Sequence, residues 1–426
     1  MTLNKHDRRK FLAGLAGGMA GSALIDPAGI FARTTSPDAG NFPANEYLFA
    51  DGITYLNTGT LGPCRRETIE ASMKAWEELE SLPVKFYPSV GSRELAEKTR
   101  TTAAKFLGCD LSEILITTST TNGMNAVAQG LRLKSGDRIV ASDQEHGGGL
   151  HCWEYFEKYY GVYIDKVVIP RGEFNPESIL SGISKAIKKE TRVITVSHVC
   201  SSTGLRMPVA EISALARSKG ILCIVDGAQS AGAIRVNVKE LGCHAYATSG
   251  HKWLMGPKGT GLLYISKDAQ PAIRPMQFEE SYNTYTGGNG VVNLACILGL
   301  DNAITYLDSV GIAKVEDHNM SIRNRLYERL QNVPNMTIVS PPPGPLASPM
   351  LTCLLSDKFD RQAFVKMLLD KYKVSIRPTH KEFGFNGIRF SMHIFNTAKE
   401  VDHAAGILRN ELGTPDPSKV TKNSNS

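Results

Sequence analysis

The sequence predicts an α/β protein, with a large domain built on a mainly parallel sheet flanked by helices and a smaller α+β C-terminal domain. Three observations predict it. Apolar strand-like runs alternate with segments of helical periodicity from residue 136 to residue 226, with short connections. Polar residues follow three of these strands, at 143–146, 197–201 and 226–230. A composition of 42% hydrophobic and 21% charged residues is typical of a globular protein.

Length, charge and cysteine content exclude several classes of protein. A chain of 426 residues can bury a large core and form two or three domains. The net charge of +6 is small and its basic residues are spread along the chain, so nucleic-acid binding is not indicated. The 8 cysteines are well separated and form no C-x-x-C pair, so we expect no structural metal site.

Residues 1–32 resemble a twin-arginine export signal. Arg8 and Arg9 precede Phe11, Leu12 and a Gly- and Ala-rich run that ends at Ile25. That run is too short and too rich in glycine for a transmembrane helix. A basic disordered tail would explain the arginines but not the residues after them. We therefore expect export to the periplasm through the twin-arginine translocase, and a cytoplasmic protein if this interpretation is wrong.

The large domain is expected over residues 48–294, after a Pro- and Gly-containing linker at 33–47. Apolar runs bounded by polar residues predict its strands, at 53–57, 113–118, 138–142, 164–169, 193–198, 222–226 and 262–265. Helical periodicity and stop signals predict its helices, at 66–82, 92–107, 124–131, 153–160, 177–187 and 209–219.

The small domain is expected over residues 295–414. Its predicted helices are 295–307, 312–330, 361–372 and 399–412, and its predicted strands are 336–339, 350–355, 374–377 and 388–392. Residues 415–426 are polar and are expected to be disordered.

A single lysine, Lys252, is the best candidate for binding a cofactor covalently. It lies between small and polar residues, just before the Gly-rich loop 256–261 and the apolar run 262–265. Partial burial would lower its pKa, and the neutral amine is the form that attacks a carbonyl. An isolated lysine of this kind is more often an ordinary surface residue. The choice therefore depends on what lies around it.

Two other segments at the carboxyl edge of the sheet fit the same cofactor. Asp226 follows a buried strand and offers a carboxylate to a pyridine nitrogen, although an Asp there is often only a turn residue. Residues 119–123 join a strand to a helix, so their hydroxyls and free N–H groups suit a phosphate or serve only as helix caps. A lysine, an acid and a phosphate site are what pyridoxal phosphate requires.

The residues 225–230 (VDGAQS) and 249–252 (SGHK), followed by a Gly-Pro-x-Gly-x-Gly loop, resemble the class V aminotransferase family of fold-type I pyridoxal phosphate enzymes. The resemblance extends from Tyr55 to Leu412 and is greatest to the isopenicillin N epimerase branch. It implies pyridoxal 5'-phosphate as the cofactor and a homodimer with shared active sites.

The resemblance also implies roles for individual residues. Lys252 would bind the cofactor and move the Cα proton, Asp226 would pair with the ring nitrogen, and His146 would stack on the ring. A polar loop histidine is the alternative for His146. Gln229 would lie near the phenolic oxygen. The other implied cofactor contacts are Thr120, Thr121, Ser201, Ser249, His251 and Thr286, of which Thr286 would reach the phosphate of the neighbouring subunit.

Three residues are expected to bind substrate. Arg389 resembles the family arginine that grips the α-carboxylate in a bidentate pair, with a structural ion pair as the alternative. Asn57 precedes a Gly-rich turn that can approach a ligand. Arg377 and His380 lie either at the mouth of the site as substrate contacts or in an ordinary loop. No cysteine lies between Arg377 and Arg389, where cysteine desulfurases carry the one that accepts sulfur. A metal at Glu145 and its neighbouring histidines is not expected, because a third ligand is missing.

The sequence therefore predicts a pyridoxal phosphate enzyme that acts at Cα of an amino acid or at the amino group of a small peptide, as an epimerase or an aminotransferase. An exported enzyme that tailors siderophore peptides and a cysteine or selenocysteine lyase are the alternatives within the fold. A protein that keeps the fold only as a binding scaffold is the alternative outside catalysis.

Overall fold

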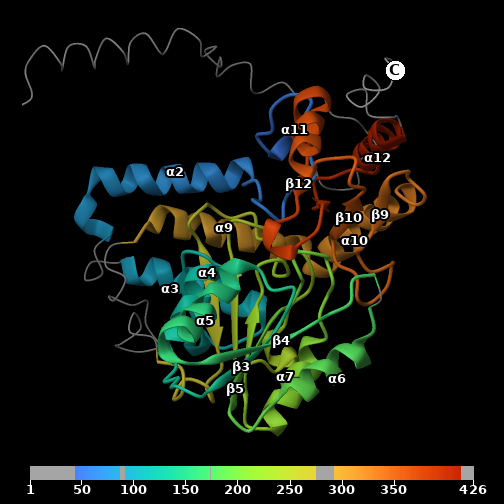
Figure 1. The fold of residues 1–426 in the computed structure, drawn as a ribbon. Helices are drawn as coiled ribbons and strands as arrows, with labels where there is room; N and C mark the ends of the chain where they lie inside the picture. Colours follow the sequence, from blue (N-terminus) through green and yellow to red (C-terminus); the bar gives the residue numbers. More distant parts are fainter. Residues whose placement is uncertain (1–43, 87–91, 173, 275–291, 414–426) are drawn as a thin grey trace, which may run out of the picture.

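The computed structural model describes residues 44–86, 92–172, 174–274 and 292–413 (Figure 1). The predicted export signal, most of the linker, the predicted disordered tail and Thr286 lie outside these residues. Within the described ranges, no helix is both long enough and apolar enough to cross a membrane.

The centre of the molecule is a seven-stranded sheet with the order β2-β8-β7-β6-β5-β3-β4. Only β8 runs antiparallel to its neighbours, and the other pairs are parallel, so the predicted mainly parallel sheet is confirmed. The strands are β2 (Ile114–Thr117), β3 (Arg138–Ser142), β4 (Tyr163–Val167), β5 (Thr191–Ser197), β6 (Leu222–Asp226), β7 (Ala245–Ser249) and β8 (Gly261–Ile265).

Both faces of this sheet are buried, because apolar residues alternate between two cores. In β6, Cys223 and Val225 belong to one core and Ile224 belongs to the other. Helices α4 (Thr120–Gly130) and α5 (Gly147–Tyr160) cover the second face. The first is covered by α3 (Ser92–Leu107), α6 (Pro176–Ala186), α7 (Val209–Ser218) and α9 (Leu294–Val310). Continuous apolar strands of this kind are typical of parallel sheets between helices.

The C-terminal elements form a second core around the antiparallel sheet β12-β13-β10-β9. Figure 1 shows them gathered beside one end of the central sheet. They are α10 (Ile312–Arg329), β9 (Met336–Ile338), β10 (Met350–Leu355), α11 (Arg361–Tyr372), β12 (Arg377–Pro378), β13 (Gly387–Ser391) and α12 (Ala398–Gly413). The proposed domain boundary at residue 294 stays a prediction. Helix α9 packs on α2 (Arg66–Ser81) and α3, and it contributes to the first core.

One predicted strand, 374–377, is wrong in an informative way. It is two strands in two sheets: β11 (Val374–Ser375) pairs in parallel with β1 (Thr54–Tyr55), and β12 pairs with β13. Leu56 N–H donates to Ser375 O at 2.9 Å, and Thr58 N–H donates to Ser391 O at 3.2 Å. The N-terminal segment therefore lies between C-terminal strands, a partnership that local periodicity does not reveal.

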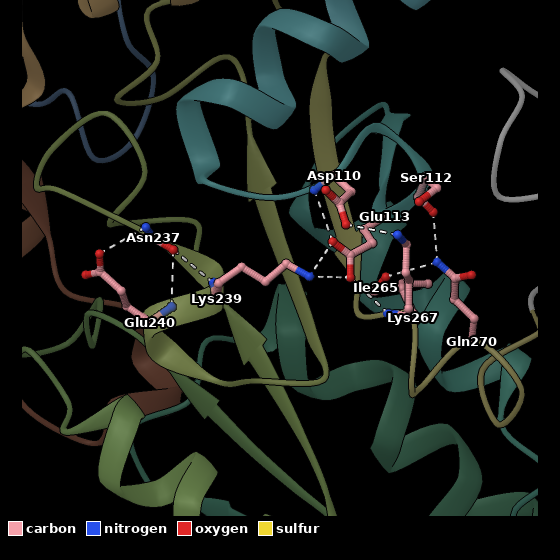
Figure 2. Close-up of polar contacts among 9 residues, drawn as sticks. All are labelled: Asp110, Ser112, Glu113, Asn237, Lys239, Glu240, Ile265, Lys267 and Gln270. Atoms are coloured by element: carbon pink, nitrogen blue, oxygen red, sulfur yellow. Dashed lines mark hydrogen bonds and ion pairs between the residues drawn. The ribbon is translucent and has the colours of Figure 1, made fainter.

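A buried ion pair joins three segments at the edge of the central sheet that is formed by β2 (Figure 2). The Glu113 side chain is fully buried, and its carboxylate lies 2.6 Å from Lys239 Nζ of the short helix α8 (Val238–Leu241). It also accepts the backbone N–H groups of Asp110 at 3.1 Å and Lys267 at 3.0 Å. One carboxylate thus joins the start of β2, helix α8 and the end of β8.

Candidate active site

The carboxyl ends of β5, β6 and β7 bring the predicted polar residues together. Ser197 and Asp226 end neighbouring strands and are paired in register, and Ser249 ends β7. Asp226 is 5% exposed, and its Oδ1 accepts the Ala228 N–H at 2.9 Å. Burial raises the pKa of Asp226, while that hydrogen bond and the charge of Lys252 lower it. This edge of the sheet is therefore where an acid and the candidate lysine meet.

Lys252 lies in the turn that follows β7. Burial, together with the charges of Arg389 and Arg377, lowers the pKa of Lys252 to about 8, and the charge of Asp226 opposes this shift. A neutral amine is therefore well populated near neutral pH. The turn is held from both sides, because Gly62 N–H donates to His251 O at 2.8 Å and Met255 N–H donates to Lys252 O at 3.0 Å.

His146 caps helix α5, which begins six residues earlier than the sequence predicts. Its Nδ1 accepts the Gly148 N–H at 2.9 Å. A neutral ring that accepts at Nδ1 carries its proton on Nε2, which lies 3.2 Å from His380 Nε2. Burial, followed by the charge of Lys252, lowers the pKa of His146 to about 3. The residue predicted to stack on a cofactor is thus a neutral ring with a fixed orientation.

The N-terminus of α4 and the end of β7 bring together the residues predicted to hold a phosphate. Ser119 caps the helix by accepting the Asn122 N–H, and Thr120 bonds to Ser249 Oγ through its N–H at 3.0 Å and its hydroxyl at 2.8 Å. Thr121, in the first turn, is exposed. The Nδ1 atom of His251 is buried and has no partner among the described residues. Hydroxyls and a helix N-terminus in this arrangement suit a phosphate.

Gln229 and Ser201 link the residues around Lys252 and Asp226 to the candidate substrate-binding residues. The Gln229 amide donates to Gly59 O at 2.9 Å and accepts from Trp253 Nε1 at 2.8 Å. It therefore joins the N-terminal turn, residues 57–62, to the lysine loop, residues 250–256. Its predicted contact with a phenolic oxygen stays a prediction. Ser201 O accepts from Arg389 at 3.1 Å, and its hydroxyl is buried with no partner in the described structure.

The three predicted substrate residues come together. Arg389, 2% exposed on β13, donates to Thr60 Oγ1 at 3.1 Å, and Arg377 donates to the same oxygen at 3.3 Å. The Thr60 hydroxyl donates to Asn57 Oδ1 at 2.6 Å. Burial, followed by the charge of Arg377, lowers the pKa of Arg389 to about 9. Within the described ranges Arg389 forms no ion pair, and its Nε has no acceptor, so a structural ion pair does not explain it.

Three further residues complete this site: the sequence gives no role to Thr60, leaves His380 open between a substrate contact and a loop residue, and gives Glu145 only as a polar residue at the sheet edge. Thr60 orients both arginines, and His380 accepts from Arg377 at 2.6 Å while its ring lies edge-on to His146, with ring centroids 4.8 Å apart. Glu145 accepts the hydroxyls of Ser142 and Ser197, and burial raises its pKa to about 7. No local pattern identifies Thr60 or His380, because the contacts that define their roles join distant parts of the chain.

His146, His380 and Glu382 each offer a ligand atom within 4.8 Å of the others. Both histidine rings already accept hydrogen bonds, since His146 Nδ1 accepts from Gly148 and His380 Nε2 accepts from Arg377. The Glu382 carboxylate accepts the Gly147 N–H at 3.3 Å. We therefore assign these side chains to a hydrogen-bonded chain.

The site fits pyridoxal phosphate. The partly neutral Lys252 suits the aldehyde, Asp226 suits the ring nitrogen, and the N-terminus of α4 suits the phosphate. Among the buried polar atoms that have no partner in the described part of the chain, three belong to candidate residues of this site and suit a bound ligand: Ser201 Oγ, His251 Nδ1 and Arg389 Nε. Fold and site together define an enzyme of the pyridoxal phosphate class.

Comparison with known proteins agrees. Residues 55–403 match the model of the aminotransferase class-V family, and the chain belongs to that family. It is 28% identical to isopenicillin N epimerase of Amycolatopsis lactamdurans, over 86% of this chain and 97% of that protein. It is also 28% identical to a probable cysteine desulfurase of Methanothermobacter thermautotrophicus, over 73% of this chain and 82% of that protein.

Solved structures show the same fold. A C-DES variant with glycine covalently linked to its PLP cofactor has a TM-score of 0.76 at 22% identity, over 84% of this chain and 97% of that one. The apo cysteine desulfurase of Thermococcus onnurineus has a TM-score of 0.74 at 25% identity, over 85% of this chain and 95% of that one. Pyridoxal phosphate is therefore the cofactor, and the protein is a class V enzyme with epimerase and desulfurase relatives.

Proposed function

We propose that this enzyme acts at Cα of an amino acid, or of the free amino end of a small peptide, with epimerisation or transamination as its outcome. One observation carries the proposal. Asp226, Arg389 and Arg377 all act on the pKa of Lys252, so the amine lies near enough to the candidate cofactor-binding acid and to both candidate substrate-binding cations to be influenced by their charges.

Each residue then has a defined task. Bound pyridoxal phosphate stabilises negative charge at the substrate Cα. Arg389 binds the α-carboxylate through its free Nε and so fixes which Cα bond can break. Lys252 takes and returns the Cα proton, because its pKa of about 8 is near the working pH. His146 offers a flat neutral ring on which the cofactor would stack, and the Asp226 carboxylate would pair with the protonated cofactor nitrogen.

The loop between β12 and β13 favours chemistry at Cα over sulfur transfer to the enzyme. It presents His380 and Glu382 to the site and contains no cysteine. Cys200 lies next to Ser201 but is buried, and burial raises the pKa of its thiol well above its ordinary value, so it is not a thiolate. A lyase that needs no enzyme thiolate remains the second candidate, because the desulfurase relative is as similar as the epimerase.

Cα exchange tests the proposal. Purified holoenzyme is incubated with amino acids in deuterated water, and Cα deuteration, chirality and keto-acid release are followed. Loss of chirality without a keto acid supports epimerisation, and conversion of the cofactor to its pyridoxamine form supports transamination. Sulfide or alanine released from cysteine contradicts both. Lys252→Ala should abolish both Cα exchange and the cofactor absorption band. A wild-type protein that takes up no cofactor would contradict the proposal and favour a protein that keeps the fold only as a binding scaffold.

Export and dimerisation belong to the same proposal. Replacing Arg8 and Arg9 by lysines should retain the protein in the cytoplasm if residues 1–32 are a twin-arginine signal. Light scattering should give the mass of a homodimer, and a Thr286→Ala variant should lose cofactor affinity if Thr286 completes the partner's phosphate site. A monomer with full activity would contradict the shared site.

A further inference from the structure

Two guanidinium groups converge on one hydroxyl at the substrate end of the site. Arg389 approaches Thr60 Oγ1 from β13 and Arg377 approaches it from β12, at 3.1 and 3.3 Å. The hydroxyl donates its proton to Asn57 Oδ1, so both of its lone pairs accept from the arginines. Thr60 therefore sets the two cations next to each other.

Within the described residues, no acid forms a salt bridge with either arginine. The groups that accept from the two guanidiniums are all uncharged: the Thr60 hydroxyl, the Ser201 carbonyl and the neutral His380 ring. Burial, followed by Arg377, lowers the pKa of His380 to about 4, so it adds no charge at neutral pH. Burial lowers the pKa of Arg377 and the charge of Glu382 opposes this, but Glu382 is exposed and its carboxylate accepts from Gly147 instead of from the arginine.

Two unpaired cations in a partly desolvated site are unfavourable unless a ligand brings negative charge. The charge of Arg377 contributes, after burial, to the lowered pKa of Arg389. One α-carboxylate would compensate one of them. The second positive charge then remains, and it is anchored independently by His380 at 2.6 Å.

We propose that the substrate carries two carboxylates, the α-carboxylate on Arg389 and a side-chain carboxylate on Arg377. This inference rests on the proposed function and adds the substrate class: a short acidic amino acid of aspartate or glutamate length, free or as the residue of a peptide that carries the reacting amino group. The length follows from the geometry, because both guanidiniums lie against one hydroxyl.

Carboxylic acids without an amino group test the inference apart from catalysis. The holoenzyme is titrated calorimetrically with glutarate, a dicarboxylate, and with butyrate, a monocarboxylate. We expect glutarate to bind about tenfold tighter or more. Arg377→Gln should remove that preference while changing butyrate affinity by less than about threefold, and Arg377→Lys should restore part of it.

A matched control separates charge from loop geometry. Arg361→Gln removes the bond to Thr379 O in the same loop, at 3.1 Å, without touching Thr60, so the glutarate preference should persist. Glutamate should likewise exceed glutamine in kcat/KM, and Arg377→Gln should narrow that ratio. Equal affinity for the two acids in the wild type, or equal losses for both in Arg377→Gln, would overturn the inference. A holoenzyme that binds glutarate selectively but exchanges no Cα proton would refute the proposed function alone.

Discussion

Gly62→Ala probes how tightly the N-terminal turn is packed on the lysine loop. A Cβ at Gly62 would lie 1.8 Å from the Lys252 carbonyl oxygen, and real Cβ contacts essentially never fall below 3.0 Å. The two backbones must therefore separate by more than about 1 Å. The Gly62 N–H bond to His251 and the Lys258 Nζ bond to Gly62 O, at 2.9 Å, lie on both sides of the collision and resist it.

The expected cost is large in activity and moderate in stability. Misplacing a catalytic amine by 1 Å can reduce the rate by about 10²-fold, and overpacking typically destabilises by about 1–3 kcal/mol. The assay is the rate of Cα deuteration by holoenzyme, together with the free energy of unfolding in urea. Gly406→Ala is the control, because nothing lies within 4 Å of its Cβ position in α12 and alanine favours a helix there. If Gly62→Ala matched this control in both measurements, the close approach would have no functional role.

Three further predictions concern buried charges. Lys239→Met leaves the Glu113 carboxylate buried without its cation and should lower the free energy of unfolding in urea by about 3–5 kcal/mol. Glu113→Gln should lower it less, because the lysine that loses its partner is half-exposed. The reverse order of the two losses would contradict the description of the pair. The folded pKa of Glu145, about 7, lies above its ordinary 4.5, so the carboxyl lowers stability as the pH rises between these values. From pH 4 to pH 8, the free energy of unfolding of Glu145→Gln should therefore rise by up to about 3 kcal/mol relative to that of the wild type. A difference between the two proteins that does not change with pH would contradict the raised pKa. Cofactor uptake by apo-protein should accelerate with pH to a plateau above about 8, the pKa of Lys252, and a midpoint near 10 would show that the amine is not buried.

The sequence predicts the sheet and its functional edge well. Strands such as β3 and β6 have the predicted bounds, because their apolar runs end at polar residues. Since parallel strands share a carboxyl edge, Asp226 and Ser197 are correctly expected to lie close together. Helix α5 begins before its predicted start, since three glycines after His146 conceal a helical turn that the His146 cap stabilises.

The substrate end could not be derived in the same way. The role of Thr60 depends on Arg377 and Arg389, more than 300 residues later, and each contact is a single hydrogen bond without a periodic pattern. His380 is ambiguous for the same reason, because only the folded chain places it against His146. The periodicity of apolar residues shows which face of one helix or strand is buried, but it does not show which helices and strands lie next to each other, and the substrate-binding residues depend on that arrangement.

The position of the N-terminal turn also constrains when the enzyme can become active during its synthesis. Leu56 is bonded to Ser375, and Gly59 N–H donates to Ser391 Oγ at 2.9 Å. At ribosomal rates of about 5–20 residues per second, these partners are synthesised roughly twenty seconds to a minute after the turn. A nascent chain therefore has its lysine loop long before it has a substrate end. Substrate binding by Arg377 and Arg389 therefore depends on elements that are made last, near the C-terminal end of the chain.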